Sequence, residues 1–218
     1  DLSLDSPADC ASKLLNKEVD LGLVPVAIIP QLQDPHIVSD FCIGADGAVE
    51  TVCLFSDVPL NEIQEVLLDY QSRTSVQLVR YLAENSWHIS PKWTSASADF
   101  IQEIGETTAG VVIGDRAFDL LQKHRYVTDL SEEWKKHTGL PFVFACWVSR
   151  RELSPDFVSE FNRALSSGLE NREKAVAESG VSSAHDLVRY VQNVISYDLD
   201  DKKRLAMKLF LDWMSKSG

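Results

Sequence analysis

The chain has 218 residues, of which 44% are hydrophobic and 25% charged, the composition of an ordinary globular protein with a sizeable core. Its net charge of −12 repels phosphate backbones, and no cluster of Lys or Arg overrides it, which argues against nucleic acid as a partner. The longest apolar run, residues 21–30, is too short to cross a bilayer, which argues against membrane insertion. The start shows no basic and apolar sequence of the kind that forms a secretory signal.

The chain contains four cysteines, far apart and with apolar neighbours: Cys10, Cys42, Cys53 and Cys146. We expect buried, reduced thiols in a cytoplasmic protein, although four thiols could also form two disulfides. The five histidines lack metal-ligand spacing, so we expect no metal site. The sequence contains no Gly-rich nucleotide loop, P-loop or Gly-x-Ser-x-Gly elbow, which argues against nucleotide-binding and hydrolase functions.

The first half of the chain alternates between strand and helix patterns. Ser6 followed by Pro7 predicts the start of a helix that ends near residue 16. A buried strand is expected over residues 21–29, then two strands around a Gly-rich turn at 44–47, the second over 49–55. A short helix opened by Pro59 precedes a strand over 65–69 and a helix over 74–84.

The alternation continues in the second half. We expect an extended piece over 87–93, short helices over 98–104 and 117–123, and between them a buried strand ending at Gly114 and Asp115. A helix from Asp129 to about residue 137 precedes a strand over 140–149. Everything after Ser154 is helical in pattern, with Pro155 just inside a start, a break at Gly180, and further starts at Ser182 and Asp198.

This order predicts an α/β protein of mixed sheets flanked by helices, with ligands bound beyond the carboxyl ends of the strands. The extended segments at 49–55 and 140–149 bracket a block of residues and are expected to be two crossing hinge strands. Residues 1–53 plus 148–218 would then form one lobe and residues 54–147 the other, with the binding cleft between the lobes.

The stretch "QSRTS" lies between a predicted strand and the helix that follows it. Free backbone N–H groups, the positive end of the helix dipole, the Arg73 guanidinium and the hydroxyls of Ser72, Thr74 and Ser75 would together bind an anion such as a carboxylate. By local pattern alone, an ordinary Ser/Thr helix cap with Arg73 in solvent is the favoured explanation of the stretch.

Other candidates also have a plain structural reading. Gly114 and Asp115 end a buried strand, where catalytic carboxylates often lie, but Asp115 could merely cap the next helix. Thr138 and Gly139 would lie in the cleft of a two-lobed protein, or simply end a helix. A threonine within a strand, such as Thr51, is normal packing material.

Five motifs in order, "VDLGLVPVAIIP", "CIGADGAVETVCLFSD", "LDYQSRTSVQLVRYL", "AGVVIGDRAF" and "EWKKHTGLPFVFACWVS", resemble the chorismate dehydratases of the futalosine route to menaquinone. The resemblance spans most of the chain. It implies the two-lobed fold of type II periplasmic binding proteins. It also implies elimination of water from chorismate, giving 3-[(1-carboxyvinyl)oxy]benzoate without a metal or organic cofactor.

The resemblance also implies roles for particular residues. The family pattern Gly-x-Val-x-[Ser/Thr]-Val matches "GAVETV" and places a catalytic hydroxyl at Thr51. Chorismate carries two carboxylates, for which the segment 72–75 would supply local positive potential. Pro25 in the first motif, with Gly114, Thr138 and Gly139, completes the expected substrate contacts. Asp115 is the one evident protein base at the motifs, and the alternative base is the enolpyruvyl carboxylate of chorismate itself.

The chain departs from this family at its start, where members have a strand and loop of the type Tyr-Leu-Asn whose Asn reaches the substrate. A βα unit of roughly 30 residues has no counterpart after Asp1. We therefore expect the natural protein to be longer, and this chain alone to be inactive and poorly stable.

Two further readings remain open. The sister enzyme of the same fold and pathway, 1,4-dihydroxy-6-naphthoate synthase, typically has "IHE" where this chain has "IGD". A solute-binding protein for a small carboxylate would share the fold without doing chemistry. The acidic helices near the C-terminus could also form the face of a homodimer.

Overall fold

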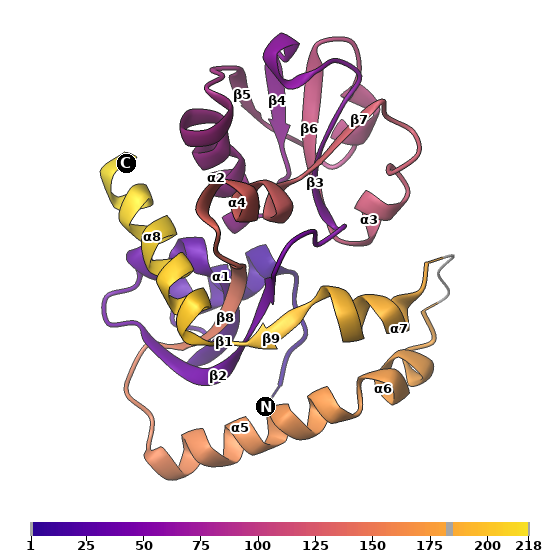
Figure 1. The fold of residues 1–218 in the computed structure, drawn as a ribbon. Coiled ribbons are helices and arrows are strands. Elements are labelled where there is room, and N and C mark those ends of the chain that lie inside the picture. Colours follow the sequence, from indigo (N-terminus) through magenta and orange to yellow (C-terminus); the bar gives the residue numbers. More distant parts are fainter. Residues whose placement is uncertain (1, 182–184, 218) are drawn as a thin grey trace.

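The computed structural model, which describes residues 2–181 and 185–217, contains two separate sheets (Figure 1). The first sheet has the order β1-β8-β2-β9, and each of its recorded pairs is antiparallel. The second has the order β5-β4-β6-β3-β7 and is mixed, because β4 runs parallel to both neighbours. The strands are β1 (Leu21–Pro25), β2 (His36–Ala45), β3 (Val52–Ser56), β4 (Glu65–Leu68), β5 (Lys92–Ser95), β6 (Thr108–Ile113), β7 (Tyr126–Asp129), β8 (Phe142–Ser149) and β9 (Ser196–Asp198).

Helices flank both sheets, as the alternating pattern predicts. The α-helices are α1 (Pro7–Leu15), α2 (Thr74–Leu82), α3 (Asp115–Phe118), α4 (Leu130–Thr138), α5 (Pro155–Glu170), α6 (Arg172–Glu178), α7 (Leu187–Arg189) and α8 (Asp201–Ser217). Short 3-10 helices are η1 (Val26–Gln31), η2 (Leu60–Glu62) and η4 (Phe100–Glu103), and π-helical turns are η3 (Ala83–Trp87) and η5 (Tyr190–Val194).

Two helix starts confirm the capping signals in the sequence. The Ser6 hydroxyl accepts a hydrogen bond from the backbone N–H of Asp9 at 3.2 Å, and Pro7 is the first residue of α1. The Ser154 hydroxyl likewise accepts from the N–H of Phe157 at 3.3 Å at the start of α5. Each serine satisfies an N–H group that the first helical turn leaves free.

The chain passes between the two sheets twice. After β2 it crosses through residues 46–51 into β3, and after α4 it returns into β8. Because β8 pairs with β1 and β2 from Phe142 to Ser149, the expected lobe boundary at residues 147 and 148 falls inside a strand of the first sheet. We propose that the lobes divide instead at the crossover 46–51 and at the loop before Phe142.

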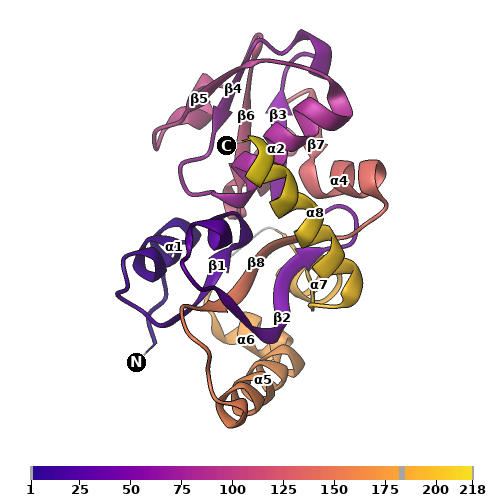
Figure 2. The ribbon, with the colours of Figure 1, turned by 90° about the vertical axis from the view of Figure 1, so that its left-hand side faces the viewer.

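Helix α8 joins the two parts of the molecule. Figures 1 and 2 both show it rising from the first sheet to the level of α2. Near its end the Trp213 ring packs edge-on against Tyr81 of α2, with ring centroids 5.3 Å apart, and the Trp213 indole N–H donates to Glu84. A core cluster that includes Leu14, Trp134 and Phe210 runs through both parts. Apolar packing therefore supports the relative placement of the sheets.

Several expected boundaries are wrong. The strand expected over 21–29 ends at Pro25, where pairing with β8 also stops, and the chain continues as η1. Pro25 lacks the N–H group that a continued ladder needs. The expected helix start at Asp198 lies in β9 instead, and Asp200 caps α8 by accepting from the N–H of Lys203. The expected start at Ser182, like Asp1, lies outside the described residues.

The four cysteines are free, as predicted, and Cys42, Cys53 and Cys146 are buried while Cys10 is half-buried. Cys42 and Cys146 face each other across β2 and β8. Burial raises the pKa of the Cys42 thiol to about 11 and that of Cys146 to about 12. Both thiols therefore remain protonated near neutral pH and act as packing groups.

Candidate active site

A cavity of about 990 Å³ lies between the two sheets. It is bounded by β1, by the crossover that carries Thr51, by the start of α2, by the end of β6 and by β8. Seven of the residues expected from the sequence line it: Pro25, Thr51, Ser72, Arg73, Thr74, Ser75 and Gly114. Segments far apart in the sequence thus converge on one cleft, as the two-lobed architecture predicts.

Thr51 is held at the end of the crossover and is 5% exposed. Its backbone carbonyl accepts a hydrogen bond from the N–H of Gly114 at 2.9 Å, which ties the crossover to the end of β6. Gly114 has φ +68°, a conformation that favours glycine. The Thr51 hydroxyl lies 2.6 Å from the Tyr190 hydroxyl and 3.5 Å from the Val49 carbonyl oxygen. No sequence motif marks Tyr190, which lies 139 positions from Thr51 along the chain.

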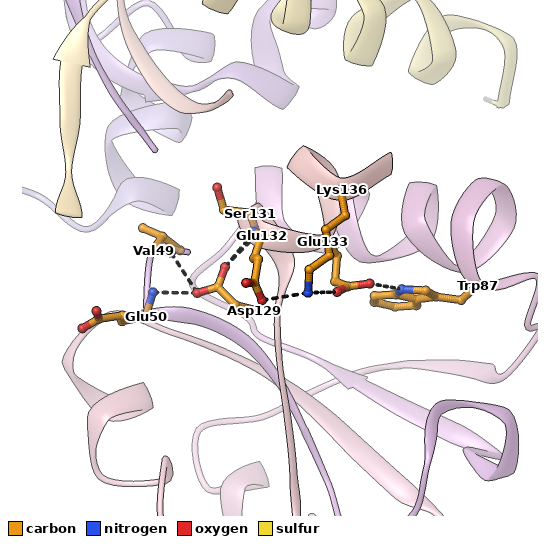
Figure 3. Close-up of polar contacts among 8 residues, drawn as sticks. All are labelled: Val49, Glu50, Trp87, Asp129, Ser131, Glu132, Glu133 and Lys136. Atoms are coloured by element: carbon orange, nitrogen blue, oxygen red, sulfur yellow. Dashed lines mark hydrogen bonds and ion pairs between the residues drawn. The ribbon is translucent and has the colours of Figure 1, made fainter. Parts of the chain in front are cut away.

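Asp129 fixes the crossover just before Thr51 (Figure 3). One carboxylate oxygen accepts from the N–H groups of Val49 and Glu50 at 2.8 and 2.7 Å, and the other from Ser131 and Glu132 at 3.0 and 3.1 Å. Burial raises the pKa of the Asp129 carboxyl, and its backbone N–H donors oppose that effect. One side chain therefore caps α4 and holds the crossover to it.

The same helix is anchored at its other side, as Figure 3 also shows. Glu133 accepts from the Trp87 indole N–H at 2.9 Å, and Lys136 forms ion pairs with Glu132 and Glu133 at 3.0 Å. The Glu133–Trp87 contact connects α4 to the π-helical turn after α2, whereas the ion pairs of Lys136 lie within α4. The contacts that hold the crossover just before Thr51 thus extend through α4 to the segment that follows α2, the helix that begins at the cavity.

Replacing Asp129 with alanine should destabilise the fold by about 3 kcal/mol. The N-terminal cap of α4 is lost, and the N–H groups of Val49 and Glu50 lose their acceptor. Urea unfolding measures the change in stability. Turnover should also fall, because residues 49–51 are no longer held in place by Asp129. Asp46→Ala is the matched control, since the ion pair of Asp46 with Lys135 is exposed and its loss should change stability by less than about 1 kcal/mol. Equal unfolding midpoints for the two variants would contradict this role of Asp129.

Within "QSRTS", the hydroxyls of Ser72 and Thr74 form hydrogen bonds inside the protein, whereas Arg73 lies at the rim of the cavity. The Ser72 hydroxyl accepts from the N–H of Ser75 at 3.0 Å and so caps the first turn of α2. The Thr74 hydroxyl donates to the Phe144 carbonyl at 2.9 Å and accepts from the N–H of Ala27 at 3.4 Å. Thr74 therefore joins α2 to the first sheet. Arg73 is exposed at the rim of the cavity, and it has no ion-pair partner within the described residues.

Asp69, which sequence reasoning missed, positions the loop that carries Arg73. Its side chain is fully buried and accepts from the N–H groups of Gln71 and Ile113, each at 3.0 Å. It also forms a 2.7 Å ion pair with Arg116 of α3. The loop after β4 is thereby fixed to the end of β6, so that Arg73 and Gly114 border the same cavity.

Three expected site residues do not line this cavity. Asp115 is exposed at the first position of α3. The Thr138 hydroxyl donates to the Trp134 carbonyl at 2.8 Å and accepts from the N–H of Leu140 at 3.1 Å, and Gly139 has φ +74°. Thr138 and Gly139 thus form the end of α4, which is their plain structural reading.

The cavity combines the Arg73 guanidinium, which has no ion-pair partner in the parts of the chain that the structure describes, with hydroxyls at a helix start, a set of groups suited to a carboxylate ligand. Among the described residues, no three His, Cys, Asp or Glu side chains are arranged to hold a metal ion. No helix in that part of the chain is long and apolar enough to span a membrane.

Comparisons with known proteins agree with this architecture. A family model described as menaquinone biosynthesis matches residues 1–216. The chain is 31% identical over 229 aligned positions to a chorismate dehydratase from Thermus thermophilus, covering 94% of this chain and 83% of the relative. A chorismate dehydratase from Campylobacter jejuni is 25% identical, with 66% of each chain covered.

Solved structures share the fold at lower sequence identity. A crystal structure of an Archaeoglobus fulgidus protein superposes with a TM-score of 0.73 at 17% identity, covering 100% of this chain and 86% of that one. The periplasmic aliphatic sulphonate binding protein SsuA from Escherichia coli gives 0.53 at 15% identity, covering 97% and 79%. These matches confirm the periplasmic-binding-protein-like fold. With the sequence matches, they confirm the predicted resemblance: the chain belongs to the menaquinone biosynthesis family and is related to chorismate dehydratases.

Proposed function

We propose that this protein is a chorismate dehydratase, a carbon–oxygen lyase that eliminates water from chorismate to give 3-[(1-carboxyvinyl)oxy]benzoate in menaquinone biosynthesis. The observation that carries the proposal is the convergence of Thr51 and the "QSRTS" segment on one cavity, in a chain of this family. Closure of the cleft around the substrate would exclude water and strengthen each polar contact.

The groups at the start of α2 suit a substrate carboxylate. Arg73 lacks an acidic partner in the described part of the chain, and Ser72 and Ser75 lie beside it at the helix terminus. Chorismate has two carboxylates, so one can bind here while the other stays near the reacting ring. In a chain of net charge −12, this local cation supplies the attraction that the overall field does not.

For the reaction itself we propose a substrate-assisted elimination. The ring carbon that bears the enolpyruvyl ether gives its proton to the enolpyruvyl carboxylate, and the neighbouring C–O bond breaks as hydroxide departs. The carboxyl group returns the proton, so water is formed and the ring becomes aromatic, which drives the reaction. Thr51 donates a hydrogen bond to the reacting region. The position of Asp115 outside the cavity lining supports this route over a protein base.

Incubating the full-length protein with chorismate and analysing the mixture by mass spectrometry tests the proposal. A product lighter than chorismate by one water is expected. Tight binding with unchanged chorismate would favour a solute-binding protein instead. Asp115→Asn separates the two routes: we expect it to retain turnover, whereas loss of turnover with intact chorismate binding would make Asp115 the base.

Replacing Arg73 with alanine should raise KM for chorismate about 10- to 100-fold, because a charge-assisted hydrogen bond to a carboxylate is lost. Arg73→Lys should recover part of the loss, since it keeps the charge but not the fork of donors. Arg125→Ala is the matched control, because Arg125 is exposed and lies over Tyr126, away from the cavity. Steady-state kinetics measures the three variants, and an unchanged KM for Arg73→Ala would remove this residue from the binding site.

A further inference from the structure

Two consecutive residues of the crossover pair with two consecutive residues near the C-terminal end of the chain. Glu50 forms an ion pair with Arg189, and the Thr51 hydroxyl lies 2.6 Å from that of Tyr190. Arg189 ends α7 and Tyr190 begins η5, immediately before the segment that leads into β9. The candidate catalytic hydroxyl therefore contacts the C-terminal part of the chain through Tyr190, while Asp129 holds the backbone just before Thr51 to α4.

The Tyr190 side chain lines the cavity and is held in a defined position there. Its ring packs edge-on against Phe118, with ring centroids 5.5 Å apart. Burial, the largest influence, raises the pKa of the Tyr190 hydroxyl to about 12. The phenol therefore keeps its proton near neutral pH, where it can donate a hydrogen bond.

The chemistry of the two hydroxyls indicates which one donates. A phenol is a far stronger acid than an aliphatic alcohol, so the favoured arrangement has the Tyr190 O–H donating to the Thr51 oxygen. The Thr51 hydroxyl can then donate to the Val49 carbonyl oxygen, but the two oxygens are 3.5 Å apart, the outer limit of a hydrogen bond. A substrate oxygen in the cavity would be a better acceptor. Donation from Tyr190 also polarises the Thr51 hydroxyl and makes it a stronger donor in turn.

We propose that Tyr190 is a positioning residue for the dehydration: it donates to the Thr51 oxygen and so directs the Thr51 hydrogen at the substrate. The inference rests on the proposed function of Thr51. It adds a residue from the C-terminal part of the chain to a site otherwise built from the crossover and from α2. Tyr190 acts through Thr51, so its loss should affect the reacting state more than the binding of chorismate.

Tyr190→Phe tests this role, because it removes the hydroxyl and keeps the ring against Phe118. We expect kcat to fall about tenfold, with KM for chorismate within about twofold of wild type. Tyr197→Phe is the matched control: Tyr197 is a half-buried tyrosine in β9 whose ring faces Arg172, and it does not line the cavity. Similar unfolding midpoints for both variants would show that the fold is intact.

A double-mutant cycle separates positioning of Thr51 from an independent effect. Once Thr51 is alanine, Tyr190→Phe should lower kcat little further. Wild-type kcat in Tyr190→Phe, or losses that multiply in Thr51→Ala/Tyr190→Phe, would overturn the inference. If the wild-type protein bound chorismate without converting it, the proposed function itself would fail. The two failures are therefore distinguishable.

Discussion

Replacing Thr51 with alanine should lower kcat for chorismate dehydration by about 10²- to 10³-fold, the usual cost of removing one donor aimed at a reacting group. Thr51 is 5% exposed and lines the cavity, its hydroxyl lies 2.6 Å from that of Tyr190, and the N–H of the preceding Glu50 donates to Asp129. Binding of chorismate should change little, because the carboxylate contacts lie at the start of α2. Steady-state kinetics and calorimetric titration measure the two effects separately.

Two variants control this result. Thr51→Ser keeps the hydroxyl and should retain most of the turnover. Thr128→Ala removes a threonine of β7 outside the cavity lining and should leave kcat unchanged. If Thr51→Ala turned over chorismate at the wild-type rate, Thr51 would be a packing residue and the reaction would need another donor.

Replacing Asp69 with alanine should destabilise the fold by about 3 kcal/mol, because the fully buried carboxylate is the ion-pair partner of Arg116 and accepts two backbone N–H groups. For a chain of this size, Tm should fall by about 6–12 °C. KM for chorismate should also rise, since the loop that carries Arg73 loses its attachment to β6. Thermal unfolding and steady-state kinetics measure these changes.

Asp57→Ala is the control for this prediction. Asp57 pairs with His124 at 3.1 Å, but its side chain is 43% exposed, so its removal should change stability by less than about 1 kcal/mol. An Asp69→Ala protein with wild-type Tm would mean that Arg116 finds an equivalent partner, such as the Gln71 side chain that already accepts from it at 2.8 Å. The attachment of the loop would then not depend on Asp69.

Local signals in the sequence predict the features that depend on neighbouring residues. The serine and proline pairs at residues 6–7 and 154–155 start helices, and Gly139 ends one, because caps and turns are decided within a few residues. The two-lobed fold and the convergence of Thr51 with residues 72–75 follow from the order of motifs and from the family resemblance.

The supporting residues could not be found in this way. Asp69 contacts Arg116 at a separation of 47 positions, Asp129 contacts Glu50 at 79, and Tyr190 contacts Thr51 at 139. Each has an ordinary local context, and its role arises only when the two sheets bring distant segments together.

The most direct test of the proposed function is a proton NMR time course of chorismate with the full-length protein. We predict that the ring signals of chorismate are replaced by aromatic signals while the two vinyl protons of the enolpyruvyl group remain, as elimination of water requires. Two results would contradict the assignment of this cavity to chorismate dehydration. One is a chorismate spectrum that stays unchanged although the protein binds chorismate, and the other is loss of the vinyl signals as pyruvate is released.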